Sequence, residues 1–153
     1  MPGEAISEAI LVIAGVVMIG ILAGAIYVSL SYIGSAVDSS SLMGSQRLMT
    51  QVQVAFATNT TSTTVYVYLQ NIGEEPVYNV PQGTLYFGPE GEEQPVGYGV
   101  TAPAWTSNAL LLNPGYTATI TLTLSQPLSK GSYYTVMYVT QNGVSTEYTF
   151  QVI

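Results

Sequence analysis

The chain has 153 residues, of which only 7% are charged, and its formal net charge is −7. Arg47 and Lys130 are its only basic residues, so it lacks the positive surface that binds phosphate backbones, and we expect no nucleic-acid partner. Cysteine and histidine are absent. Their absence excludes disulfides, thiol chemistry, haem and zinc sites, and we expect no cofactor and no metal.

The first predicted element is a long apolar helix. No charged residue occurs from Ala9 to Val37, and about 29 residues of helix extend roughly 43 Å, whereas a bilayer core needs about 20 apolar residues. A cleaved signal peptide is disfavoured because Glu4 and Glu8 make the flank acidic and the apolar stretch is about twice too long. A membrane anchor and an oligomerising helix both fit the segment.

Small residues inside this helix indicate close helix–helix packing. Gly20 and Gly24 form a G-x-x-x-G pair, with Gly15 and Ala23 nearby. Small residues let helix backbones approach each other, although the pattern is common in apolar helices. We therefore name these four positions as predicted packing residues of a helix bundle.

Two carboxylates precede the apolar run. Glu4 suits the positive end of the helix dipole. Glu8 lies nearer the apolar residues, where a desolvated carboxylate needs a partner such as the amino terminus of a neighbouring subunit. The sequence therefore makes Glu8 the candidate for an intersubunit contact.

Serine and glycine dominate the segment from Ser29 to Gly44. Serine lowers helix propensity, so we expect the helix to fray and end here in a flexible neck. The predicted domains are a helix with its neck over residues 1–45 and a β domain over residues 46–153.

After residue 50 the apolar period changes to two, which is typical of half-buried strands. Tyr116–Leu124 shows the cleanest alternation, with threonines on one face and aliphatic residues on the other. Asn142-Gly143 predicts a hairpin with a type I′ turn, and Asn113-Pro114-Gly115 and Ser129-Lys130-Gly131 predict further turns. The predicted strands are Gln51–Phe56, Thr64–Leu69, Thr84–Phe87, Tyr116–Leu124, Tyr133–Thr140 and Val144–Val152.

Six or seven short strands separated by turns favour an antiparallel sandwich of immunoglobulin-like size. The fold class is therefore α+β, with one long N-terminal helix and an all-β domain. No serine or threonine has a histidine to activate it, so we expect no enzyme activity. The acidic cluster over residues 90–93 reads as a solvated hairpin tip rather than a calcium site.

Two further features of the β domain bear on its surface. Asn59-Thr60-Thr61 is an N-glycosylation sequon in a polar loop, and a polar hairpin loop without a glycan fits equally well. Tyr66 and Tyr68 alternate with aliphatic residues and are expected on an exposed, adhesive face or beneath another part of the domain. Trp105 is expected at the rim of the sandwich.

The order of these elements resembles the archaeal type IV pilin-like proteins, and most of all the archaellum accessory proteins FlaG and FlaF. The residues that carry the resemblance are Ile6–Ala14 at the helix start, Val65–Gly73 with its Asn-x-Gly end, Leu112–Gly115, Asn142–Val144 and Tyr148–Phe150. Met1-Pro2-Gly3 departs from the basic leader of archaeal prepilins. It fits either a processed subunit or an accessory protein that is not processed.

The resemblance implies a structural subunit of an archaeal extracellular filament, either a pilus or an archaellum. Its helices would bundle in a helical homo-oligomer, after a stage in the membrane, and its β domains would face outward. The alternative is a membrane-anchored FlaG/FlaF-like stator module that binds the surface-layer protein or other filament subunits.

Overall fold

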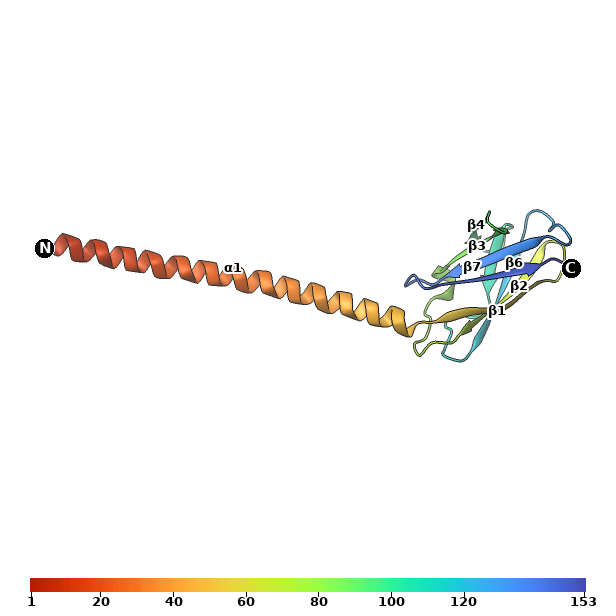
Figure 1. Cartoon of the computed structure of the whole chain (residues 1–153), viewed down its shortest axis with the longest axis horizontal. Coiled ribbons are helices and arrows are strands. Elements are labelled where there is room, and N and C mark those ends of the chain that lie inside the picture. The colour runs from red at the N-terminus through yellow and green to blue at the C-terminus, as the bar shows by residue number, and fades with distance from the viewer. The chain divides into compact units, whose positions relative to one another are not determined.

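The structure is a computed structural model that describes all residues from Met1 to Ile153. It divides into two compact units, Met1–Gly44 and Ser45–Ile153. We call the second unit the head. Figure 1 shows a single helix followed by strands, and each unit is described by itself below.

One continuous helix, α1, extends from Pro2 to Met49. The expectation that the helix frays and ends within Ser29–Gly44 is therefore wrong. Four of the six serine hydroxyls in this stretch find a partner inside the helix, because each bonds to the carbonyl four residues earlier. The pairs are Ser29 with Ala25, Ser31 with Tyr27, Ser35 with Ser31 and Ser39 with Ser35, at 2.9–3.0 Å.

The head contains eight strands and one short 3₁₀ helix, η1, and its six predicted strands are confirmed. Two more strands, β4 and β5, lie between the third and fourth predicted ones. The elements are β1 Val52–Asn59, β2 Thr64–Asn71, η1 Val80–Gln82, β3 Thr84–Pro89, β4 Gln94–Tyr98, β5 Ala104–Ser107, β6 Thr117–Thr123, β7 Tyr133–Val139 and β8 Ser145–Gln151.

The strands form one sheet in the order β1-β2-β6-β5-β4-β3-β7-β8. All pairs are antiparallel except β4 with β5, which is parallel. This parallel pair joins two four-stranded halves, β1-β2-β6-β5 and β4-β3-β7-β8. The two outermost strands approach each other through side chains, since the Val54 N–H donates to Thr146 Oγ1 at 3.0 Å. The result is a nearly closed sandwich, and the predicted α+β class is confirmed.

The core lies between the two halves and follows from the period-two pattern. On β2 the buried residues are Val65, Val67 and Leu69, and Val67 lies opposite Ile120 of β6. Leu85, Val136 and Tyr138 supply the core from the other half. Burying such side chains stabilises the fold by about 1.5–3 kcal/mol each before entropy is counted.

Trp105 is a core residue, and its expected place at the rim is wrong. It lies on β5 and is only 1% exposed, with its Nε1–H donating to the Val96 carbonyl at 3.0 Å. Its ring packs edge-on against Tyr138 at 6.1 Å and Tyr98 at 4.9 Å. The hydrogen bond to strand β4 lets the indole be buried completely, because its one polar atom is satisfied.

The hairpin at Asn142-Gly143 forms, but not through a type I′ turn. Only Gly143 has a positive φ, 87°. Its N–H donates to the Thr140 carbonyl at 2.9 Å, and the Thr140 N–H donates to Val144 at 2.8 Å. This is the longer hairpin loop, in which glycine takes the left-handed position. The turns at Asn113–Gly115 and Ser129–Gly131 are confirmed by N–H···O bonds of 3.1 Å that close each of them.

Candidate assembly surfaces

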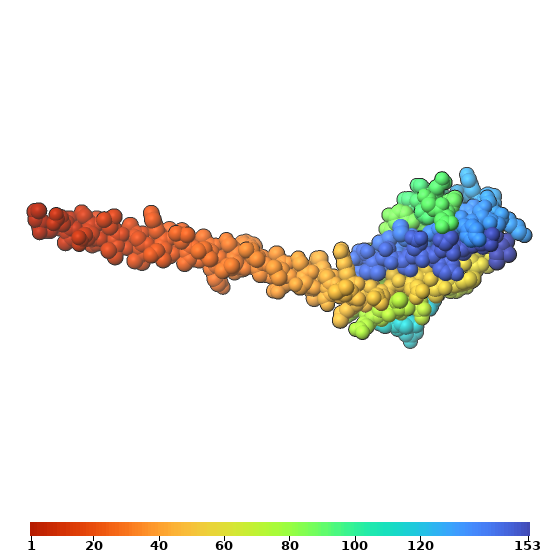
Figure 2. All heavy atoms as spheres, viewed as in Figure 1, coloured from red at the N-terminus to blue at the C-terminus, as the bar shows by residue number.

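None of the residues of helix α1 is buried. In Figure 2 its atoms form one rod with no second layer of protein atoms over them. By length and composition it is long and apolar enough to cross a membrane. Apolar surface of this extent must be covered by lipid or by protein.

The predicted packing residues of α1 do not all share one face. At 100° per residue, Gly20, Ala23 and Gly24 fall within an arc of roughly 100°. Gly15 points roughly 140° away from Gly20. A side chain added at Gly15, Gly20 or Gly24 meets no other atom of the chain within 4 Å. Gly20, Ala23 and Gly24 therefore share one side of α1, and Gly15 lies on another side.

Glu8 is exposed near the start of α1. The one basic residue of this helix is Arg47, in its last turn. Glu8 thus has no opposite charge within its own helix.

The last turn of α1 belongs to the head and is held by hydrogen bonds from two loops. The Glu74 N–H donates to the Met49 carbonyl at 3.0 Å. From the β7–β8 hairpin, Asn142 Nδ2 donates to Thr50 Oγ1 at 3.0 Å, while that hydroxyl donates to the Gln46 carbonyl at 2.8 Å. The bond from Glu74 satisfies the Met49 carbonyl, which would otherwise lack a partner at the helix C-terminus, whereas the Gln46 carbonyl also accepts from the Thr50 N–H at 2.9 Å.

Asn71 organises the first of these loops. Its buried amide donates to the carbonyls of Glu75 and Leu112 at 2.8 and 2.9 Å, and its Oδ1 accepts from the Gly73 N–H at 2.9 Å. Gly73 lies so close to the Met49 carbonyl and the Gln51 nitrogen that a β-carbon would clash with both. The Asn-x-Gly sequence noted in the resemblance thus forms the loop that contacts the C-terminal end of α1. The hydrogen bonds of the Asn71 side chain were not predicted, because all three of its partners are backbone atoms.

Asn59 ends β1 at the opposite end of that strand from the helix. It is half-buried, and its Oδ1 accepts from the Ile153 N–H at 3.3 Å. Its amide nitrogen, the atom that would carry a glycan, donates to no group of the chain. Of the two polar atoms of the Asn59 side chain, the nitrogen is therefore the one without a hydrogen-bond partner in the chain.

Tyr66 and Tyr68 lie on the outward side of β2, opposite the buried aliphatic residues of that strand. Tyr68 stacks on Phe56 of β1 with ring centroids 6.4 Å apart. On β6 their neighbours are Thr121 and Thr119. We call this outward side of β1, β2, β6 and β5 the uncharged face, because those four strands contain no charged residue.

The acidic residues gather elsewhere on the head. In the β3–β4 turn, Glu93 Oε1 accepts from the Gly91 N–H at 2.9 Å, and this bond lowers the pKa of the Glu93 carboxyl below its ordinary value. The turn projects its carboxylates into solvent, since Glu90, Glu92 and Gly91 are all exposed. No group of three or more carboxylates is placed to hold a metal ion.

The chain thus combines one long apolar helix with a small, mostly antiparallel β sandwich. The archaeal-type flagellin model matches residues 3–150, so the chain belongs to the archaeal-type flagellin family. The comparison with curated protein sequences found no match.

Solved structures give the relation in more detail. The chain is 45% identical to the archaellum periplasmic stator protein FlaG from Sulfolobus acidocaldarius, with a TM-score of 0.64, over 66% of this chain and 99% of that one. It is 44% identical to a chain of the FlaF and FlaG stator complex of the same organism, over 65% and 88%, with a TM-score of 0.64. It shares the fold of the Methanospirillum hungatei flagellum over 96% and 92%, with a TM-score of 0.80 at 16% identity.

Proposed function

We propose that this chain is a structural subunit of an archaeal extracellular filament and that it polymerises by burying α1 among the helices of other copies. The observation that carries the proposal is the extent of exposed apolar residues on α1. They extend from Ile6 to Leu48, roughly 63 Å of helix, whereas a bilayer core is about 30 Å thick. A bilayer therefore covers only about half of this length, and a bundle of like helices covers all of it.

The gain from such burial is large enough to drive assembly. Burying about 20 apolar side chains at about 1.5–3 kcal/mol each stabilises the assembly by tens of kcal/mol per subunit. The conformational entropy that the subunit loses on ordering opposes this gain. The packing face of Gly20, Ala23 and Gly24 lets two helices approach closely. Before assembly the same helix holds the subunit in the membrane, and afterwards the heads form the outer wall at the cell surface. The proposed role is structural and needs no catalytic group or cofactor.

The proposal is tested with the full chain purified in detergent. On removal of the detergent we expect filaments, and cryo-electron microscopy of them should show α1 in the central core. Single chains that enter lipid vesicles and never form filaments would overturn the proposal.

Glu8 enters this proposal as a contact between subunits. A carboxylate surrounded by helices of other copies needs a positive partner from one of them. Replacing it in Glu8→Gln should raise the protein concentration needed for filaments, while Glu4→Gln should leave that concentration unchanged. Equal effects of the two substitutions would refute a special role for Glu8.

The second candidate is a membrane-anchored stator module, and the 45% identity with FlaG favours it. In that role α1 stays in lipid and the head binds the surface-layer protein or a FlaF-like partner. A protein consisting of residues 45–153 should then sediment with isolated surface layer or form a complex with the FlaF-like protein. If it does neither while the full chain forms filaments, the filament role is retained and the stator role is rejected.

We also propose that Asn59 carries an N-linked glycan, because its sequon lies at a strand end with the amide nitrogen unbonded. Mass spectrometry of the protein from an archaeal host should find added sugar mass on the peptide that contains Asn59. The mass should be absent from Asn59→Gln and present in Asn113→Gln, since Asn113 has no sequon. An unmodified wild-type peptide would refute this assignment.

A further inference from the structure

Charge is distributed unevenly over the head. Its six carboxylates and two basic side chains give it a net charge of −4. All eight lie outside β1, β2, β5 and β6: they are Arg47, Glu74, Glu75, Glu90, Glu92, Glu93, Lys130 and Glu147. The uncharged face is therefore a four-stranded surface on an otherwise acidic domain.

An irregularity in β1 places an aromatic ring on this face. Val52 and Val54 are buried, so strict alternation would turn residue 56 inward as well. The register shifts between Val54 and Phe56, and as a result Phe56 is 50% exposed while Ala57 takes the buried position. A β-bulge of this kind redirects side chains. Here it exposes an apolar ring beside Tyr68, where an unbroken strand would have buried it.

The surface around Phe56 has the composition of an interface centre. Tyr68 pairs with Thr119, Tyr66 pairs with Thr121, and Thr121 in turn pairs with Thr106 of β5. Aromatic residues are enriched and charged residues are depleted at the centres of protein–protein interfaces. Tyrosine offers a large contact area at a low cost in conformational entropy. These side chains are half-buried or exposed, although the Phe56 ring also meets Tyr148 of β8 edge-on, with ring centroids 6.3 Å apart.

We propose that the uncharged face is the surface by which one head contacts a second copy of this chain. The net negative charge of the head is the reason for expecting a second copy to bind at this face. Two copies that each carry −4 repel each other wherever carboxylates meet, and juxtaposed like charges oppose association. Of the two sheet halves, only this one presents an outward side that a like-charged copy approaches without meeting a carboxylate. The inference deepens the proposed filament and rests on it.

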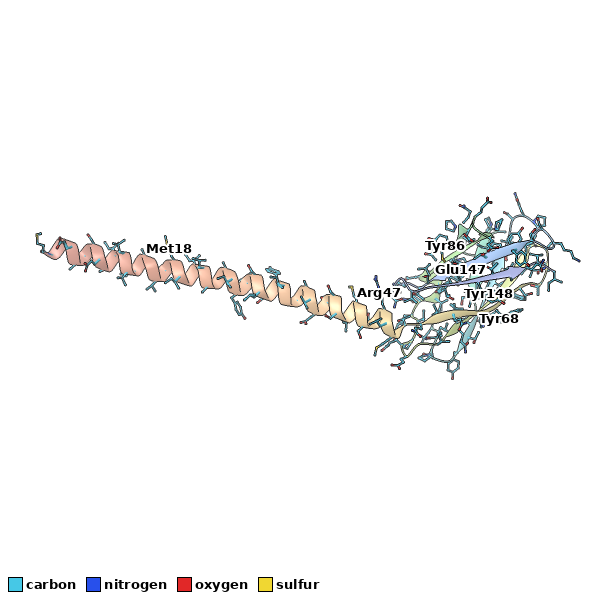
Figure 3. The ribbon with its side chains drawn as sticks, in the orientation of Figure 1. Met18, Arg47, Tyr68, Tyr86, Glu147 and Tyr148 are labelled. Atoms are coloured by element: carbon cyan, nitrogen blue, oxygen red, sulfur yellow. The ribbon has the colours of Figure 1, made fainter.

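The outward side of the other half, β4-β3-β7-β8, carries a charged residue and is therefore less suited to contact a second copy. Tyr86, Met137 and Glu147 lie in one row across β3, β7 and β8, and Figure 3 labels Tyr86 and Glu147 there and Tyr68 on the other half. A second copy seated on this row would bury the Glu147 carboxylate without a partner, which is costly. The row nevertheless offers a matched position for a control.

The test compares Thr121→Lys with Met137→Lys in the full chain. Both residues are half-buried on the outward side of an inner strand, and both substitutions reduce the net negative charge by one. General repulsion between copies therefore falls equally in the two variants. We expect Thr121→Lys to raise the protein concentration needed for filaments by about tenfold or more, and Met137→Lys to change it less than about twofold.

A second measurement maps the contact directly. The chain has no cysteine, so Thr119→Cys carries a benzophenone maleimide at a single position. In assembled filaments we expect its photoproducts to join two chains, and those from Met137→Cys to remain within one chain. Photoproducts at Thr119 that stay within one chain, in filaments that form normally, would overturn the inference and leave the proposed function intact.

The two hypotheses therefore fail in different ways. If the wild-type chain forms no filaments, the proposed function fails and takes the inference with it. If filaments form and Thr121→Lys assembles like the wild type, only the inference fails. Should Thr121→Lys prove unfolded by circular dichroism of residues 45–153, the photocrosslinks from Thr119→Cys decide alone.

Discussion

Asn71 and Gly73 act together at the end of β2, where a buried amide meets a residue without a side chain. The amide bonds three backbone groups, and Gly73 lets the backbone approach the end of α1. The Asn-x-Gly motif could be recognised in the sequence by resemblance. Its role could not be predicted, because the Leu112 carbonyl that it binds is 41 residues away.

Removing the Asn71 amide should destabilise the head. In Asn71→Ala the Glu75 and Leu112 carbonyls and the Gly73 N–H each lose a hydrogen bond, and we expect the free energy of unfolding to fall by about 2–4 kcal/mol. Asn113→Ala is the control, because Asn113 is exposed and its side chain bonds to no group of the chain; we expect a change within about 0.5 kcal/mol. Urea unfolding of residues 45–153 measures both. Equal effects would mean that the Asn71 bonds contribute nothing.

Tyr138 gives the head a pH dependence in alkali. Its hydroxyl is buried and donates to the Val80 carbonyl at 2.8 Å, and burial raises the pKa of this phenol well above its ordinary value of 10.0. The folded state then holds a proton that the unfolded state loses above about pH 10. The stabilisation is complete below that pH and is lost as the pH rises further.

We therefore expect the free energy of unfolding to fall by up to about 1.4 kcal/mol for each pH unit above about 10. Tyr138→Phe should be less stable at neutral pH, because the Val80 carbonyl loses one of its two donors, and should lack this slope. In Tyr133→Phe, where the phenol is exposed, the slope should persist. Urea titrations between about pH 8 and 11 measure it, and a slope retained in Tyr138→Phe would contradict the assignment.

At the scale of elements, the helix was predicted in type but not in length. The apolar run fixed its existence, whereas the serine-rich stretch was read as a break because serine bonds to nearby backbone in many conformations. The hydroxyls of Ser29–Ser39 bond instead to carbonyls within the helix. A serine hydroxyl can bond to nearby backbone both at a break in a helix and within a continuous helix, so the sequence alone did not distinguish the two.

The strands show a similar division. Alternating segments such as Thr64–Asn71 and Thr117–Thr123 were predicted to within two residues. Gln94–Tyr98 and Ala104–Ser107 were missed because they are short, contain proline or glycine, or lack alternation. They are strands because they pair with β3 and β6, and such pairing depends on distant parts of the chain.

The packing face of α1 leads to a prediction for this element. Gly20→Leu and Gly15→Leu increase helix propensity equally, by about 0.8 kcal/mol. Only Gly20 belongs to the face shared with Ala23 and Gly24, so Gly20→Leu should hold neighbouring helices apart and reduce filament yield about tenfold or more, while Gly15→Leu should reduce it less. Pelleting assays of both variants measure the yield. A larger loss in Gly15→Leu would place the packing face elsewhere on the helix.

At the scale of the whole molecule, stability owes little to charge. The chain has 11 charged residues among 153, and its core is aliphatic and aromatic. The scarcity of charge could be read from composition alone. That the head's charges lie outside one four-stranded surface could be recognised only from the strand order. Strands β5 and β6 come much later in the sequence than β1 and β2, and only their pairing in the sheet places all four on the same face.

The free energy of unfolding of residues 45–153 should therefore change by less than about 1 kcal/mol between about 0.05 M and about 1 M NaCl. Salt screens the attraction between opposite charges, and the head has few pairs of opposite charges for it to weaken. Differential scanning calorimetry and urea titrations at each salt concentration check this. A strong loss of stability in high salt would reveal ion pairs that hold the head together.

The two loops that hold the end of α1 belong to different halves of the sandwich. Asn71–Glu75 continues from β2, and Thr140–Val144 joins β7 to β8. Strand β1, which follows the helix directly, lies at the edge of the sheet and has β2 as its one paired strand. Without the two loops, a mechanical load passing through α1 would pull on this edge strand and peel it from its neighbour. With them, a load passing through α1 would divide between both halves of the sandwich.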